Sequence, residues 1–148
     1  MKIAVMGTGY VGLVTGALLA DAGNTVICVD IDERKVAMLR EGHIPIYEEG
    51  LESIVQRNHE DGRLLFTTDA ADAIRKSNIV FIAVGTPSDE DGSADLKYVL
   101  KVAEQIGDNM NATKIVICKS TVPVGTCDKV QGVIAGRTNT PFHVVSNP

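Results

Sequence analysis

The chain has 148 residues, 45% of them hydrophobic, and its 14 Lys and Arg against 19 Asp and Glu give a net charge of −5. This length suits one domain with one ordinary core. The acidic balance, with no cluster of basic residues, argues against nucleic acid as the main partner. Because the apolar runs are strand-sized and the N-terminus does not resemble a signal peptide, we expect no membrane partner and a cytoplasmic location.

Apolar runs rich in Val and Ile alternate with segments of helical periodicity along the whole chain. The predicted strands are 2–6, 25–30, 64–67, 78–84, 114–118 and 142–146. The predicted helices are 10–23, 32–40, 50–60, 69–76, 95–108 and 124–135, with caps at Gly23, Asp69 and Asp95. This alternation predicts an α/β fold, a doubly wound parallel sheet (Rossmann fold) with strand order 3-2-1-4-5-6 and helices on both faces.

The first predicted strand leads directly into a glycine-rich turn, Gly7-Thr8-Gly9-Tyr10-Val11-Gly12. A G-x-G-x-x-G pattern alone is a weak signal, but here a strand precedes it, a helix follows it and Asp30 ends the next strand. Gly7 permits the tight turn, Gly9 lets the backbone approach a pyrophosphate, and Gly12 lets the helix pack against the sheet. The pyrophosphate is expected on the free N–H groups of the helix that starts near Tyr10.

Asp30 is the candidate for choosing between two dinucleotides. Its carboxylate can accept hydrogen bonds from both hydroxyls of an adenosine ribose and would repel a 2′-phosphate, which favours NAD over NADP. Arg34 and Lys35 follow closely and keep NADP open as an alternative. A purely structural alternative is that Asp30 caps the helix that follows it.

Further polar loops follow the carboxyl ends of other strands: Gly85-Thr86-Pro87, Lys119-Ser120-Thr121-Val122-Pro123 and Ser146-Asn147-Pro148. Ligands of open parallel sheets bind beyond this edge. We therefore expect Thr86 and Pro87 over the nicotinamide half of the cofactor, and Ser120 and Thr121 where its ring meets a reacting carbon. A plain turn at Thr86 and helix capping by Ser120 and Thr121 are the structural alternatives.

The sequence predicts no metal site. Cys28, Cys118 and Cys127 lack both C-x-x-C spacing and a suitably spaced histidine, so reduced and mostly buried thiols are expected. The acidic run 89–92 has no further ligand at the spacing of a calcium loop and is interpreted as a solvated turn. No catalytic role is assigned to His43, His59 or His143.

Taken together, several of these motifs resemble the nucleotide-sugar dehydrogenases, the UDP-glucose/GDP-mannose dehydrogenase family. The resemblance covers essentially the whole chain, and the runs that carry it are Gly7–Leu13, Pro45–Glu48, Val84–Pro87, Asp91–Leu96 and Lys119–Thr126. The last two look most like the UDP-glucose 6-dehydrogenases. They look less like the members that act on GDP-mannose or UDP-N-acetylmannosamine, which stay open as alternatives.

The resemblance implies an oxidation of the sugar C6 alcohol to a carboxylate, from UDP-glucose to UDP-glucuronate, with two NAD and a thiohemiacetal on a cysteine. It implies an auxiliary catalytic role for Thr121 in ordering a water or oxyanion near the reacting carbon. It places Tyr10 on the nicotinamide side. The cofactor contacts implied by the resemblance are Val11, Asp30, Lys35, Thr86 and Thr121.

The sequence departs from the family pattern in two places. Glu49 stands where the family has a second proline before Gly50, which we expect to loosen that loop. The family's Asn-Pro-Glu-Phe-Leu-Arg-Glu-Gly motif is present only as far as Pro148. We therefore expect residues 1–148 to be the NAD-binding domain of a longer enzyme and to be inactive alone. The linker helix, the UDP-sugar domain, the catalytic cysteine and the contacts of a homodimer or higher oligomer would lie outside it.

Two other function classes stay open. Methyltransferases that use S-adenosylmethionine share the glycine turn, but they usually carry an acidic residue at the end of the first strand, where this chain has Lys2-Ile3-Ala4-Val5-Met6. The other class is a stand-alone, non-catalytic module that responds to NAD.

Overall fold

The computed structural model describes residues 1–148 and contains six strands and six helices in strict alternation except for two consecutive helices, α2 and α3. The strands are β1 (Lys2–Met6), β2 (Thr25–Val29), β3 (Leu64–Thr67), β4 (Ile79–Ile82), β5 (Lys114–Cys118) and β6 (Phe142–Ser146). The helices are α1 (Tyr10–Asp21), α2 (Glu33–Arg40), α3 (Leu51–Glu60), α4 (Ala70–Lys76), α5 (Lys97–Asp108) and α6 (Thr126–Ala135). None of them combines the length and hydropathy needed to span a bilayer.

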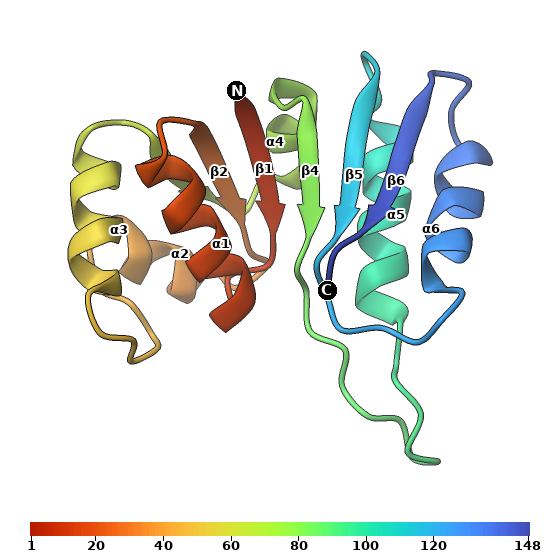
Figure 1. Ribbon diagram of the computed structural model, residues 1–148, viewed down its shortest axis with the longest axis horizontal. Coiled ribbons are helices and arrows are strands. Elements are labelled where there is room, and N and C mark those ends of the chain that lie inside the picture. The colour runs from red at the N-terminus through yellow and green to blue at the C-terminus, as the bar shows by residue number, and fades with distance from the viewer.

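All six strands lie parallel in one sheet of order β3-β2-β1-β4-β5-β6, which confirms the predicted Rossmann topology. The order reverses between β1 and β4, which are paired from Ile3 with Ile79 to Met6 with Ile82. Connections from these two strands therefore leave toward opposite faces (Figure 1). In open parallel sheets the ligand crevice lies at such a point, beyond the carboxyl ends of the strands.

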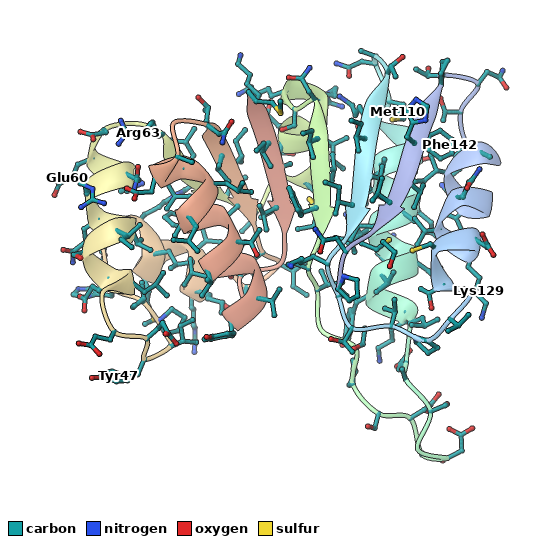
Figure 2. The ribbon with its side chains drawn as sticks, viewed as in Figure 1. Tyr47, Glu60, Arg63, Met110, Lys129 and Phe142 are labelled. Atoms are coloured by element: carbon teal, nitrogen blue, oxygen red, sulfur yellow. The ribbon has the colours of Figure 1, made fainter.

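Helices cover the sheet on both sides and enclose two separate apolar clusters (Figure 1). Helices α1, α2 and α3 pack over β1 to β4 through Leu13, Leu39 and Val55, which are fully or almost fully buried. Helices α4, α5 and α6 cover the other face, where Met110 and Phe142 pack against the buried cluster (Figure 2). Burial on both faces explains why β1, β2 and β4 are almost continuous apolar runs instead of alternating apolar and polar residues.

Every predicted element is present, and each end coincides with the predicted one or lies one or two residues inside it. The predicted strand 78–84 is confined to Ile79–Ile82, and the predicted helices 95–108 and 124–135 begin at Lys97 and Thr126. Asp69 caps α4 as expected, because its carboxylate accepts a hydrogen bond from the Asp72 N–H at 3.0 Å. The expected cap at Asp95 is wrong by one residue: Leu96 occupies the cap position, and Asp95 accepts from the Lys97 N–H at 3.0 Å.

The glycine turn joins β1 to α1 through contacts too close for any side chain. Gly7 has a φ of +108°, and its N–H donates to the Val29 carbonyl at 2.7 Å. A Cβ atom added at Gly12 would lie 1.9 Å from the Gly7 carbonyl oxygen, and one at Gly16 would lie 2.6 Å from the Cys28 Sγ. Helix α1 can therefore pack directly over the end of β1, as the sequence predicted for Gly12.

We expect Gly12→Ala to lower the free energy of unfolding by about 3 kcal/mol or more, because the added methyl group meets rigid backbone. Gly9→Ala is the matched control in the same turn: Gly9 has a φ of −71° and nothing lies within 4 Å of the added Cβ. Urea unfolding of the two variants should show a large loss for Gly12→Ala and a loss below about 1 kcal/mol for Gly9→Ala. Equal losses would contradict the assigned close approach.

Candidate cofactor-binding site

The N-terminus of α1 is an open group of N–H donors at the carboxyl edge of the sheet. Gly9 is its N-cap residue and supplies no side-chain cap, and the first turn contains no acidic residue. The first helical hydrogen bond runs from the Leu13 N–H to the Gly9 carbonyl at 2.9 Å, so the N–H groups before Leu13 have no intrahelical acceptor. Gly9, Tyr10 and Val11 are exposed. This is the arrangement that binds a phosphate or another anion.

Asp30 lies directly beside this turn and is held there by Thr8. The Thr8 hydroxyl donates to Asp30 Oδ2 at 2.6 Å, and the Thr8 N–H donates to the same oxygen at 3.1 Å. The other oxygen, Oδ1, accepts from the Asp32 N–H at 3.0 Å. The structural alternative, in which Asp30 caps the following helix, is therefore wrong. Asp32 is the cap of α2, because its carboxylate accepts hydrogen bonds from the N–H groups of Arg34 and Lys35.

Asp30 is an ionised carboxylate at neutral pH. Burial acts to raise its pKa, but the hydrogen bonds from Thr8 and Asp32 and the charge of Lys35 outweigh burial and hold the pKa below its ordinary value. The Lys35 ammonium lies 3.7 Å from Asp30 Oδ2. Lys35 therefore faces the same corner of the site as Asp30, and its contact with the cofactor stays a prediction.

The loops after β4 and β5 meet at the same edge of the sheet. The Thr86 hydroxyl donates to the Thr121 carbonyl at 3.0 Å, and the Lys119 N–H donates to the Ile82 carbonyl at 2.8 Å. The Thr121 side chain is exposed and makes no hydrogen bond within the chain. Thr86 and Pro87 form neither a turn nor a bend, which argues against the plain turn, and the turn residues of this segment are 90 and 91. The segment projects from the carboxyl edge of the sheet (Figure 1).

Ser120 has a different environment from its neighbour. Its side chain is buried, and its hydroxyl donates to the Val84 carbonyl at 2.7 Å, with the Ile82 carbonyl at 3.2 Å. Neither Ser120 nor Thr121 caps α6, so that alternative is wrong: Gly125 is the N-cap residue, with a φ of +91° and no side-chain cap. The Ser120 hydroxyl thus ties the end of β5 to the end of β4.

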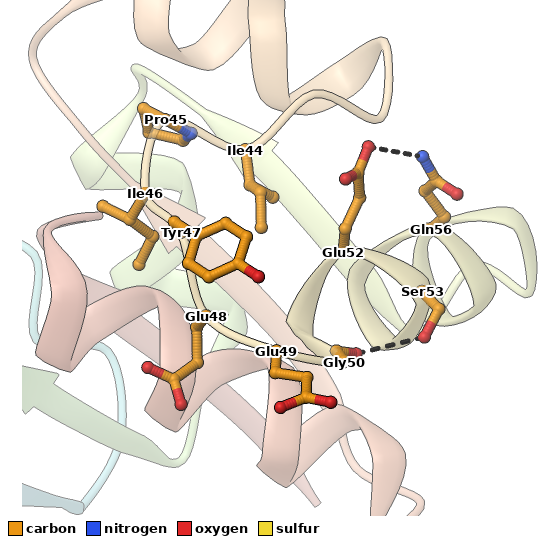
Figure 3. Close-up of a pocket in the computed structure, with 10 residues that line it drawn as sticks. All are labelled: Ile44, Pro45, Ile46, Tyr47, Glu48, Glu49, Gly50, Glu52, Ser53 and Gln56. Atoms are coloured by element: carbon orange, nitrogen blue, oxygen red, sulfur yellow. Dashed lines mark hydrogen bonds between the residues drawn. The ribbon is translucent and has the colours of Figure 1, made fainter.

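A separate hollow of about 720 Å³ lies beside α3, lined by residues 44–50 of the preceding loop and by the first turns of α3 (Figure 3). Glu48, Glu49 and Glu52 make its lining acidic, so it is unsuited to a pyrophosphate. The Tyr10 hydroxyl donates to Glu48 at 3.0 Å and links this loop to the start of α1. That hydrogen bond and the Glu48 charge raise the pKa of Tyr10. Tyr10 therefore faces the loop of the family-like Pro-Ile-Tyr-Glu run.

No group of three or more His, Cys, Asp or Glu side chains is arranged to hold a metal ion. The acidic run 89–92 is an exposed turn, as interpreted from the sequence. All three cysteines are free, and Cys28 and Cys118 are buried. Burial raises the pKa of Cys28 to about 12, and burial together with the neighbouring Cys127 raises that of Cys118 to about 12.

Thiol labelling should distinguish these cysteines. At pH 8 a pKa of about 12 leaves about one thiolate in ten thousand, and Cys28 and Cys118 are also buried. We expect a disulfide reagent to label one thiol rapidly in the native chain, three after unfolding, and none rapidly in Cys127→Ser. Rapid labelling of a second native thiol would contradict the burial described.

The loop before α3 offers a test of the missing family proline. The Glu49 N–H donates no hydrogen bond, no residue other than glycine has a positive φ, and Gly50 alone takes the left-handed conformation there. Glu49→Pro should therefore raise the free energy of unfolding by about 0.4–1 kcal/mol and the melting temperature by about 1–4 °C. Glu49→Ala controls for the lost charge, and an equal gain in both variants would rule out the effect of the ring.

Comparisons with known proteins agree with this geometry. Residues 1–148 match the model of the UDP-glucose/GDP-mannose dehydrogenase family, NAD binding domain. The chain is 53% identical to the UDP-glucose 6-dehydrogenase TuaD of Bacillus subtilis, over 99% of this chain and 32% of that protein. It is also 53% identical to the UDP-glucose 6-dehydrogenase of Pseudomonas aeruginosa, over 100% of this chain and 34% of that protein.

Solved structures show the same fold at high similarity. A GDP-mannose dehydrogenase from Pseudomonas aeruginosa superposes with a TM-score of 0.95 at 36% identity, covering 100% of this chain and 36% of that one. A UDP-glucose dehydrogenase from Pyrobaculum islandicum superposes with a TM-score of 0.94 at 40% identity, covering 99% of this chain and 35% of that one. The chain thus spans about a third of the length of these relatives. It belongs to the UDP-glucose/GDP-mannose dehydrogenase family and corresponds to that family's NAD binding domain.

Proposed function

We propose that NAD⁺ binds across the carboxyl edge of this sheet, with its pyrophosphate on the N-terminus of α1 and its adenosine ribose on Asp30. The observation that supports this placement most directly is the uncapped start of α1 with an ionised Asp30 fixed beside it. The space around Gly9 is open, so a pyrophosphate can approach the backbone N–H groups of Tyr10 and Val11.

The nicotinamide half of the cofactor then extends toward the loops after β4 and β5. Bound NAD⁺ supplies the acceptor for a hydride. Thr121 presents a hydroxyl with no partner in the chain, which suits it to order a water or an oxyanion near a reacting carbon. Thr86 holds the backbone of Thr121 in place, and Pro87 accepts the Asp95 N–H at 2.7 Å and closes the base of the projecting segment.

Two of the proposed cofactor residues act through the structure around them. The Ser120 hydroxyl is committed to the Val84 carbonyl, so we propose that Ser120 shapes the nicotinamide side by joining β4 and β5. Lys35 pairs with Asp30 and offsets part of its negative charge at the ribose corner.

For the longer protein we propose oxidation of UDP-glucose to UDP-glucuronate. The support is the 53% identity with two UDP-glucose 6-dehydrogenases, whereas the GDP-mannose dehydrogenase among the solved structures is 36% identical. Hydride transfer requires a sugar held in near-attack geometry. The described residues provide the cofactor half of that arrangement, and Cys28 and Cys118 are too deeply buried to serve as nucleophiles.

Calorimetric titration with NAD⁺ and NADP⁺ tests the proposal. We expect wild type to bind NAD⁺ in preference to NADP⁺. Asp30→Ala should weaken the affinity for NAD⁺ about ten- to hundredfold, because a hydrogen bond to a charged group is lost. It should also leave Arg34 and Lys35 free to attract the 2′-phosphate of NADP⁺.

Asp61→Ala is the matched control, since Asp61 pairs with Arg63 at 2.9 Å beyond the end of α3 and carries the same charge. It should leave both affinities unchanged. The proposal fails if wild type binds neither dinucleotide, or if Asp30→Ala retains the wild-type ratio of the two affinities.

A further inference from the structure

Thr8 is the middle residue of the first Gly-x-Gly pair, and its side chain is fully buried although the glycines around it are open to solvent or nearly so. Its hydroxyl and its N–H both donate to a single oxygen, Asp30 Oδ2. The hydroxyl bond, at 2.6 Å, has the length of a charge-assisted O–H···O⁻ hydrogen bond. It joins two segments 22 residues apart in the sequence.

The hydrogen bonds around Asp30 leave little of its carboxylate open. Each carboxylate oxygen offers about two acceptor positions. Thr8 fills both positions of Oδ2, beside which Lys35 also lies, and the Asp32 N–H fills one position of Oδ1. One position remains, on Oδ1. A ribose that meets Asp30 in this arrangement is bound by one hydroxyl on Oδ1, not by two hydroxyls that share both oxygens.

We propose that Thr8 is a positioning residue for cofactor choice: by occupying Oδ2 it fixes the Asp30 side chain so that Oδ1 faces the adenosine ribose. This inference rests on the proposed function of the edge as an NAD⁺ site and adds a determinant to it. Without the hydroxyl, the Asp30 carboxylate is free to rotate toward the Lys35 ammonium, which lies 3.7 Å away. The corner then offers the ribose a less ordered acceptor and offers a 2′-phosphate less repulsion.

The test compares Thr8→Val, which removes the hydroxyl at nearly constant shape, with Thr8→Ser, which retains it. Both are titrated with NAD⁺ and NADP⁺ by calorimetry. We expect Thr8→Val to weaken the affinity for NAD⁺ about tenfold and to reduce the ratio of the NAD⁺ and NADP⁺ affinities by a similar factor. Thr8→Ser should keep both quantities within about twofold of wild type, since it restores the same hydrogen bond.

Ser77→Ala is the matched control for a lost buried hydroxyl. The Ser77 side chain is buried at the opposite edge of the sheet and donates to the Ala73 carbonyl at 2.7 Å. This variant should melt at a lower temperature without changing the ratio of the two affinities. If Thr8 only stabilises the fold, Thr8→Val should likewise melt at a lower temperature without a change in the ratio of the two affinities. An unchanged NAD⁺/NADP⁺ ratio in a folded Thr8→Val therefore overturns the proposal.

Two further outcomes are decisive. If Thr8→Val does not fold, Thr8→Ala takes its place in the same titrations. If Thr8→Ser loses the preference for NAD⁺ over NADP⁺, the proposal is overturned, because this variant keeps the hydroxyl. If wild type itself binds neither dinucleotide, the proposed function of the edge fails first. Wild-type preference combined with an unchanged ratio in Thr8→Val leaves that function intact and rejects only the role of Thr8.

Discussion

The close approach of α1 to the end of β1 is the constraint on which the rest of the site depends. Backbone meets backbone at Gly7 and Gly12, and a Cβ at Gly7 would also lie 2.6 Å from the Ala83 carbonyl oxygen after β4. Three segments therefore converge at the point where the strand order reverses. The helix begins directly over this crevice, so its unpaired N–H groups and the positive end of its dipole face the same space as Asp30 and the loops after β4 and β5.

The site attracts an anion in a chain of net charge −5 because the charges are distributed locally. Helix α1 has no acidic residue in its first turn, whereas α2, α3, α4 and α6 each have one. Glu48 accepts a hydrogen bond from the Tyr10 hydroxyl, and Lys35 lies beside Asp30. Since exposed charges are screened over about 10 Å at moderate ionic strength, the helix N-terminus and these few neighbours dominate the potential at the crevice.

The sequence predicts the fold well because its strongest signals are local and agree with one another. Six apolar strands with helices between them favour a parallel sheet, and the glycine turn followed by Asp30 indicates the 3-2-1-4-5-6 order and the binding edge. Asp69 is predictable as a cap because it directly precedes an apolar helical run. The expectation at Asp95 misses by one residue because Asp95 and Leu96 compete for the same turn, and propensity alone does not separate them.

The side-chain partners in the site depend on tertiary contacts that no local pattern encodes. Ser120 and Thr121 follow each other in sequence, yet the Ser120 hydroxyl is buried against the carbonyls of Ile82 and Val84 at the end of β4, and Thr121 is exposed. Thr8 lies between two glycines, and nothing in the sequence around it indicates its hydrogen bond to Asp30, 22 residues away. Asp32, by contrast, could have been recognised as the cap of α2 from its position before Glu33.

The most direct test of the account is a crystal structure of this chain with NAD⁺. The account predicts electron density for the pyrophosphate over the N–H groups of Tyr10 and Val11, with the adenosine ribose against Asp30 Oδ1 and the nicotinamide toward Thr121. A dinucleotide in the hollow lined by residues 44–50 and α3, or one that enters the edge with its adenosine half at Thr121, would contradict the account.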